Sequence, residues 1–218
     1  IINKKTLNFQ SEDNANRYKG TIDFKPFYLN TTLNYDGISL KHIFDNNSIF
    51  IDLFESEILN NKNLSASLNL KVKDITNINE LNNLDLRISI EEGDIKFTDS
   101  SIMWKDDLLI KLNDCQLAMN DEGINLIGTI VLDFDDINDF YSSFQTKKIN
   151  RKDIKNIEVN FIYNFNSKSF SFDNPRVNNS QNIQLEKLLD NFNSRNYRIF
   201  NKITFKNFVN NFFQTYDG

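Results

Sequence analysis

The amino-acid sequence predicts a mainly β protein, an elongated antiparallel meander with short helices and a helical C-terminus. Two observations lead to this fold class. Apolar and polar residues alternate in one segment after another, and this period of two is that of a strand with one buried face. The segments are roughly five to eight residues long and recur about every dozen residues, which is typical of strands joined by turns.

The N-terminal third of the chain predicts an edge, a pair of strands and a helix. Residues 1–17 are polar with weak periodicity and are expected to form a tail or an irregular edge. Strand alternation begins in residues 18–24, is interrupted by Pro26 and resumes in residues 27–35. Residues 48–59 differ, because their large apolar side chains fall at helical spacing and predict a short amphipathic helix.

The middle of the chain shows the clearest alternation. Every second residue of 64–72 is apolar, and residues 84–90 repeat the pattern, so both segments are predicted to be strands. Further strands follow at similar spacing, in residues 95–97, 102–104, 108–112, 115–119 and 124–134. Together they predict a sheet with one apolar and one polar face.

The C-terminal part mixes strands and helices. A second short helix is predicted in residues 136–144, and two more strands in residues 157–165 and 170–172. Beyond Pro175 the apolar period becomes helical. It produces two stripes, namely Leu185, Leu188, Leu189 and Phe192, and then Phe205, Phe208, Val209, Phe212 and Phe213 behind a Thr204 cap.

These expectations divide the chain into three parts. Residues 1–17 are the polar tail or edge, residues 18–177 are a β-domain with the helices near 48–59 and 136–144, and residues 178–218 are a C-terminal helical segment. We expect the phenylalanine-rich helix of the last part to cap the sheet rather than contact a membrane, because it lacks a strongly basic polar face.

The residue inventory offers little for catalysis. His42 is the only histidine, and its apolar neighbours favour a structural role. Cys115 lies on an alternating strand, where a small buried side chain is expected rather than a reactive thiolate. The six glycines are too scattered to form a phosphate-binding loop. We therefore expect no enzymatic activity and no cofactor.

The charged residues argue against nucleic acid and metal as ligands. The net charge is −5 and the pI near 5.0, whereas phosphate binding needs a clustered basic surface. The densest basic stretch is expected to be a solvated turn rather than an anion site, and it consists of Lys147, Lys148, Arg151, Lys152 and Lys155. The acidic group lacks the glycine and terminal glutamate of a calcium loop and is expected to cap a helix; its members are Asp133, Asp135, Asp136 and Asp139.

Residues 84–134 contain three motifs in order. A strand runs into the acidic turn Glu91-Glu92-Gly93-Asp94 and a second strand, then come a bend and strand at Asp99-Ser100-Ser101-Ile102-Met103-Trp104, then a unit from Gly123 to Ile130. In these motifs the segment resembles the AsmA family of bacterial envelope proteins, which includes TamB-like members. This resemblance implies a sheet curled into an open, taco-like groove. It also implies a periplasmic protein anchored in the inner membrane that carries phospholipid towards the outer membrane.

The chain itself shows no membrane anchor. No run of apolar residues approaches the roughly 20 that cross a bilayer. Because the chain starts at Ile1 rather than Met, we expect a fragment of a longer protein whose N-terminal anchor is missing. The sequence leaves the oligomeric state open.

The apolar face of the central strands is the predicted binding surface. Nine residues are expected to line a groove for phospholipid or another acyl lipid, namely Leu64, Ala66, Leu68, Leu70, Val72, Leu84, Leu86, Ile88 and Ile90. Periodicity alone favours a filled core instead. Two alternatives therefore stay open, a closed barrel or sandwich that binds one small apolar ligand and a purely structural or interaction domain.

Overall fold

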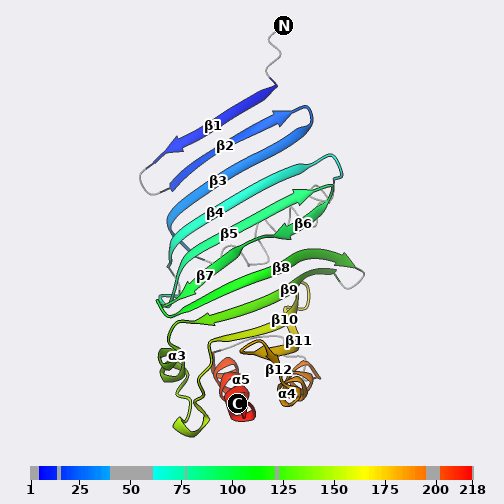
Figure 1. Cartoon of the computed structure of the whole chain (residues 1–218). Helices are drawn as coiled ribbons and strands as arrows, with labels where there is room; N and C mark the ends of the chain where they lie inside the picture. The colour runs from blue at the N-terminus through cyan, green and yellow to red at the C-terminus, as the bar shows by residue number, and fades with distance from the viewer. Residues whose placement is uncertain are drawn as a thin grey trace. The chain divides into compact units, whose positions relative to one another are not determined.

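The computed structural model describes residues 5–13, 16–39, 61–76, 78–120, 123–194 and 202–217 (Figure 1). The chain is mainly β and its strand pairs are mostly antiparallel, which confirms the predicted fold class. It divides into two compact units. Unit 1 comprises Ile1–Lys105 with Asp114–Leu117, and unit 2 comprises Asp106–Asn113 with Ala118–Gly218.

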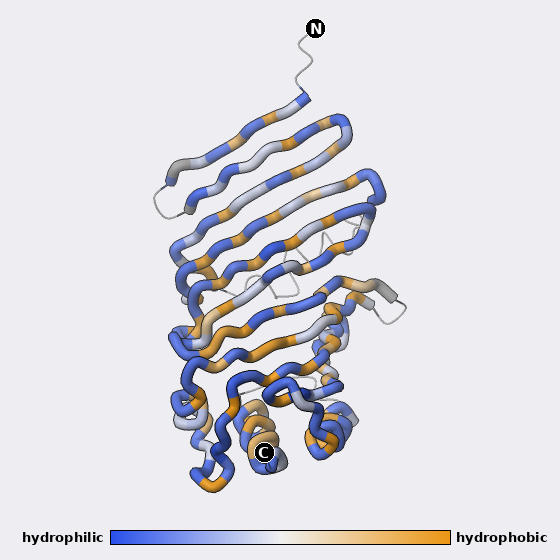
Figure 2. Tube along the Cα trace, viewed as in Figure 1, coloured by the Kyte–Doolittle hydropathy of each residue, from blue (hydrophilic) through white to orange (hydrophobic). Residues whose placement is uncertain are grey.

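Unit 1 is a sheet of strands paired in the order β1-β2-β3-β4-β5-β6, followed by residues 115–117 of β8. Strand β7 pairs with the other half of β5. The strands are β1 (Thr6–Glu12), β2 (Asn16–Phe24), β3 (Phe27–Ile38), β4 (Ser65–Ile75), β5 (Leu81–Glu91), β6 (Asp94–Phe97), β7 (Ser100–Trp104) and β8 (Leu108–Asn120). Along them apolar and polar residues alternate, as Figure 2 shows.

Two features of unit 1 depart from the predicted meander. Strands β3 and β4 pair in parallel, with Leu29 opposite Ala66. Parallel neighbours require a crossover connection, which local periodicity does not reveal. The other difference is β1, an ordered edge strand inside residues 1–17, paired with β2 along its whole length. The predicted helix at 48–59 and His42 lie outside the described residues.

Unit 2 pairs its strands in the order β8-β9-β10-β11-β12 and carries the described helices. The elements are β9 (Gly123–Phe134), α3 (Ile137–Phe144), the 3₁₀ turn η2 (Lys148–Asn150), β10 (Asn156–Asn164), β11 (Ser169–Val177), β12 (Ser180–Gln181), α4 (Ile183–Ser194) and α5 (Lys202–Thr215). In neither unit do the described strands close into a barrel, so the barrel form of the small-ligand alternative is wrong.

The helices of unit 2 confirm the predicted positions with one correction. Helix α3 starts behind Asp136, whose carboxylate accepts a hydrogen bond of 2.9 Å from the backbone N–H of Asn138, so the acidic group supplies a helix cap. Thr204 is not a cap, because α5 already begins at Lys202. None of the helices in the described ranges is both long and apolar enough to cross a bilayer.

The division into units differs from the expected one. The expected β-domain of residues 18–177 and helical segment of residues 178–218 stay a prediction, while the two compact units divide the chain around residues 105–118. Helices α4 and α5 belong to the same unit as β9–β12, since α4 packs on β11 and α5 packs on α3 and α4. The helical segment therefore packs within the core of unit 2.

Candidate functional site

The strand register of unit 1 gives its sheet one apolar and one polar face. Residues directly opposite each other on paired strands share a face. One such row crosses the unit as Leu7, Ile22, Leu29, Ala66, Ile90, Ile95 and Leu117, and the next as Phe9, Gly20, Thr31, Leu68, Ile88, Phe97 and Cys115. On the opposite face the row between them reads Asn8, Thr21, Asn30, Ser67, Ser89, Lys96 and Gln116.

The predicted lining residues lie together on this apolar face. Eight of the nine form four directly opposed pairs of β4 and β5, namely Ala66 with Ile90, Leu68 with Ile88, Leu70 with Leu86, and Val72 with Leu84. Leu64 is half-buried just before β4 begins. The structure therefore brings the predicted set together as one surface, but whether that surface takes up a ligand stays a prediction.

The nine residues do not share one environment. Leu70 and Val72 are buried in a cluster with Ile75, against which Leu84 and Leu86 also pack. That end of the strands is protein core. Leu64, Leu68 and Ile90 are half-buried, so the surface that could meet a ligand is narrower than the predicted set.

The most accessible part of the apolar face is its β1–β2 edge, which the prediction left out. Leu7 is 47% exposed and Tyr18 is 43% exposed, whereas Ile95 on β6 and Cys115 on β8 are buried. Leu7 and Phe9 stand two residues apart between polar neighbours. This short alternation was the signal for β1, but two apolar residues alone are too few to separate a strand from a loop.

Gly20 and Thr31 form a gap in the second apolar row. A Cβ atom on Gly20 would lie 2.4 Å from Cζ of Phe9, so the absence of a side chain makes room for that ring. Thr31 is 8% exposed, and its hydroxyl has no hydrogen-bond partner among the described residues. A buried hydroxyl without a partner loses its hydration, so this position is a polar point that a bound group could satisfy.

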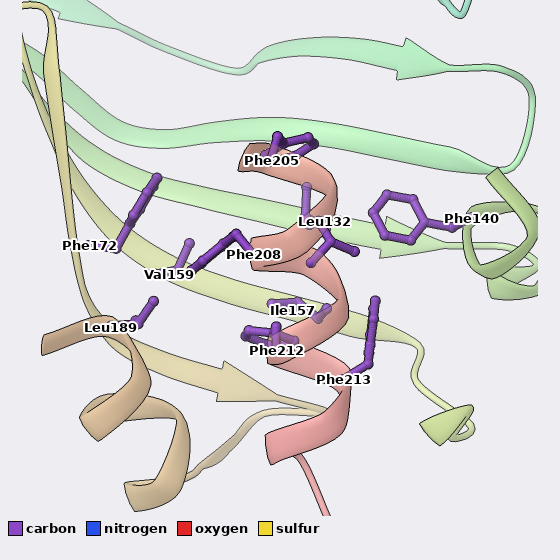
Figure 3. Close-up of a pocket in the computed structure, with 11 residues that line it drawn as sticks. Leu132, Phe140, Ile157, Val159, Phe172, Leu189, Phe205, Phe208, Phe212 and Phe213 are labelled. Atoms are coloured by element: carbon purple, nitrogen blue, oxygen red, sulfur yellow. The ribbon is translucent and has the colours of Figure 1, made fainter. Parts of the chain in front are cut away.

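Unit 2 has a second apolar surface, a pocket between its sheet and helix α5 (Figure 3). Its volume is about 100 Å³ and every lining residue is apolar. The lining comes from β9, β10, β11 and all three helices, as Leu132, Phe140, Ile157, Val159, Phe172, Leu189, Phe205, Phe208, Val209, Phe212 and Phe213. An enclosed cavity of about 150 Å³ with such a lining binds benzene, so this smaller pocket is suited at most to a small apolar group.

Aromatic packing holds the pocket in place. The Phe208 ring centroid on α5 lies 4.7 Å from that of Phe192 on α4 and 6.2 Å from that of Phe172 on β11. Nearer the C-terminal end of α5, the ring centroid of Phe213 lies 4.8 Å from that of Tyr141. The phenylalanine stripes of the helices were predicted, but the pocket was not, because its walls are distant in sequence.

The described residues offer no centre for metal chemistry. Within the described ranges, no three His, Cys, Asp or Glu side chains are grouped so as to hold a metal ion. Cys115 is a buried free thiol on the apolar face. Desolvation is the main cause that raises the pKa of Asp107, and repulsion from Asp139 and Asp136 adds to it. These carboxylates lie beside the Asp136 cap of α3. The two apolar surfaces are thus the features that could bind a ligand.

Comparison with known proteins adds no relative. No protein-family model matches the chain, and neither a curated protein nor a solved structure matches it. The resemblance to the AsmA family therefore stays a prediction from the quoted motifs.

Proposed function

We propose that this chain binds acyl lipids along the apolar face of unit 1 and acts, without catalysis, in bacterial envelope biogenesis of the AsmA type. The observation that supports this most is the continuity of the first apolar row, from Leu7 to Leu117, over seven neighbouring strands, with accessible residues at the β1–β2 edge. Contiguous apolar residues exposed on one face are typical of a surface that binds a ligand or partner.

The dimensions suit a hydrocarbon chain. The row from β1 to β8 has six inter-strand steps of about 4.8 Å, so it is roughly 29 Å long. This is close to the hydrocarbon thickness of a whole bilayer, about 30 Å, and about twice the thickness of one leaflet. The length of the row therefore suits an acyl chain, and its accessible end at Leu7 is where such a chain would first contact it.

The energetics suit movement more than storage. Burial of an acyl chain recovers about 0.8 kcal/mol per CH₂ group, which is nearly what the bilayer provides. Transfer from a bilayer to the apolar face is then close to isoenergetic, and no bond is made or broken. In this proposal the ligand is phospholipid, the location is the periplasm, and an N-terminal anchor in the longer protein holds it at the inner membrane.

Native mass spectrometry of the purified protein tests the proposal. We expect co-purified phospholipid, and we expect its loss in Leu68→Asp with the far-ultraviolet circular dichroism spectrum retained. Ser67→Asp is the matched control, because Ser67 is the neighbouring residue on the polar face of the same strand. Absence of lipid from the wild type, or equal loss in both variants, would contradict lipid binding on this face.

The pocket of unit 2 supports a second candidate function, the binding of one small apolar ligand. Its all-apolar lining offers burial but no polar group to orient the ligand. Val209→Phe should fill the pocket and abolish a single bound ligand, while phospholipid on unit 1 is unaffected. One small ligand per chain, lost in this variant alone, would favour the second candidate over the first.

A further inference from the structure

The turn between α3 and β10 carries an isoleucine in the middle of the basic stretch. Ile149 lies in η2 and is 84% exposed. The neighbouring Lys147 and Lys148 are also exposed, and their ammonium groups form no ion pair with the described residues. An apolar side chain thus projects into water directly after two lysines that form no ion pair with the described residues.

The base of this turn is braced from inside unit 2. The Tyr141 hydroxyl donates to the carbonyl oxygen of Lys152 at 2.8 Å and accepts from the Lys152 N–H at 3.0 Å. Arg151 donates from Nε to the Thr146 carbonyl at 3.1 Å and lies 5.7 Å from the Tyr141 ring. Because Tyr141 is itself buried against Phe213, these contacts tie the base of the turn, at Arg151 and Lys152, to the core of unit 2.

We propose that this turn is a contact point for an anionic membrane surface. Ile149 enters the boundary between headgroups and acyl chains, and Lys147 and Lys148 pair with lipid phosphates while their stems follow Ile149 inward. The chain as a whole carries a net charge of −5, so a negatively charged bilayer repels most of it. The basic turn is therefore the place at which approach is favourable.

A bilayer fits this turn better than an acidic protein partner does. A stable protein interface buries about 800 Å² on each partner, which a single turn with one apolar side chain cannot supply. A fluid bilayer can accommodate a single apolar side chain, and the attraction of many headgroups adds to the binding free energy. The inference goes beyond the proposed function, because it concerns unit 2 and does not depend on lipid binding by unit 1.

Flotation with vesicles tests it. The wild-type chain is incubated with vesicles of phosphatidylcholine alone or with about a third of phosphatidylglycerol, and the bound fraction is measured over a range of salt concentrations. We expect binding to the anionic vesicles that weakens as salt increases. Lys147→Gln/Lys148→Gln should bind about 30-fold more weakly, and Ile149→Asp at least about tenfold more weakly.

Ile183→Asp is the matched control. Ile183 is 69% exposed at the start of α4, but its neighbours Asn182 and Gln184 are uncharged, so its replacement should leave vesicle binding unchanged. Leu68→Asp should also bind vesicles like the wild type, which separates this inference from lipid uptake on unit 1. Failure of the wild type to bind anionic vesicles, or equal weakening by Ile149→Asp and Ile183→Asp, would overturn the proposal.

Discussion

Units 1 and 2 are both sheets with one apolar face. Among the described residues, helices cover this face in unit 2 and none covers it in unit 1. In unit 2, helices α4 and α5 lie against the sheet, and Phe192 and Phe208 pack with Phe172 of β11. The described part of unit 1 contains no helix, and the same kind of face there reaches 47% exposure at Leu7. Strand alternation thus determines which face is apolar, whereas other elements determine whether that face is core or surface.

The largest expected difference between the two units is the effect of replacing Phe213. Phe213 of unit 2 is 2% exposed and contacts the rings of Phe140 and Tyr141, so Phe213→Ala should cost about 3–5 kcal/mol of unfolding free energy. Phe24→Ala, at an exposed position of unit 1, should cost less than about 1 kcal/mol. Urea denaturation followed by circular dichroism measures both, and equal costs would contradict the distinction between the faces.

A smaller loss of stability is expected from Tyr141, which ties the turn before β10 to the core of unit 2. Tyr141→Phe removes both hydrogen bonds to the backbone of Lys152 and should cost about 1–2 kcal/mol at neutral pH.

The same residue predicts a pH dependence. Burial raises the pKa of Tyr141 above its ordinary value of 10.0, although the Lys152 hydrogen bond and Arg151 act in the opposite direction. Above that pH the unfolded chain releases the proton more readily than the folded one, so stability is retained below pH 10 and falls as the pH rises further. Denaturation between pH 8 and 11 should show a steeper fall for the wild type than for Tyr141→Phe; parallel curves would count against the burial of this hydroxyl.

Thr31 provides a corresponding stability test in unit 1. Its buried hydroxyl has no hydrogen-bond partner in the part of the chain that the structure describes, so Thr31→Val should stabilise the lipid-free protein by about 1 kcal/mol. The melting temperature after delipidation measures this effect. A loss of stability would mean that the hydroxyl is satisfied in solution.

The smallest expected effect lies on the polar face of unit 2. Lys111 on β8 and Asp133 on β9 form a partly exposed ion pair of 2.6 Å. Lys111→Met should change the unfolding free energy by less than about 1 kcal/mol, because exposed pairs are screened by water and salt. A larger cost in the same urea assay would show that polar faces matter more than this account allows.

Much of the fold could be predicted from the sequence, because strand and helix periods are local. The strands at residues 64–72 and 84–90 and the helix at 136–144 are where their periods predicted them. The parallel pairing of β3 with β4 and the division of the chain into units depend on contacts between residues far apart in sequence, which no local pattern contains. Local alternation was enough to identify the lining set as one face. The buried cluster around Leu70 and the pocket under α5 depend on contacts between distant residues and were not foreseen.

Photocrosslinking from two tyrosines tests lipid binding on unit 1 most directly. Tyr18 and Tyr28 are 43% and 37% exposed, but Tyr18 is opposite Leu33 on the apolar face, whereas Tyr28 is opposite Asp23 and Ser65 on the polar face. With p-benzoylphenylalanine at either position and phospholipid present, crosslinks to lipid should form from position 18 and not from position 28. Equal crosslinking from both positions, or none from position 18, would contradict the proposal that the apolar face holds acyl chains.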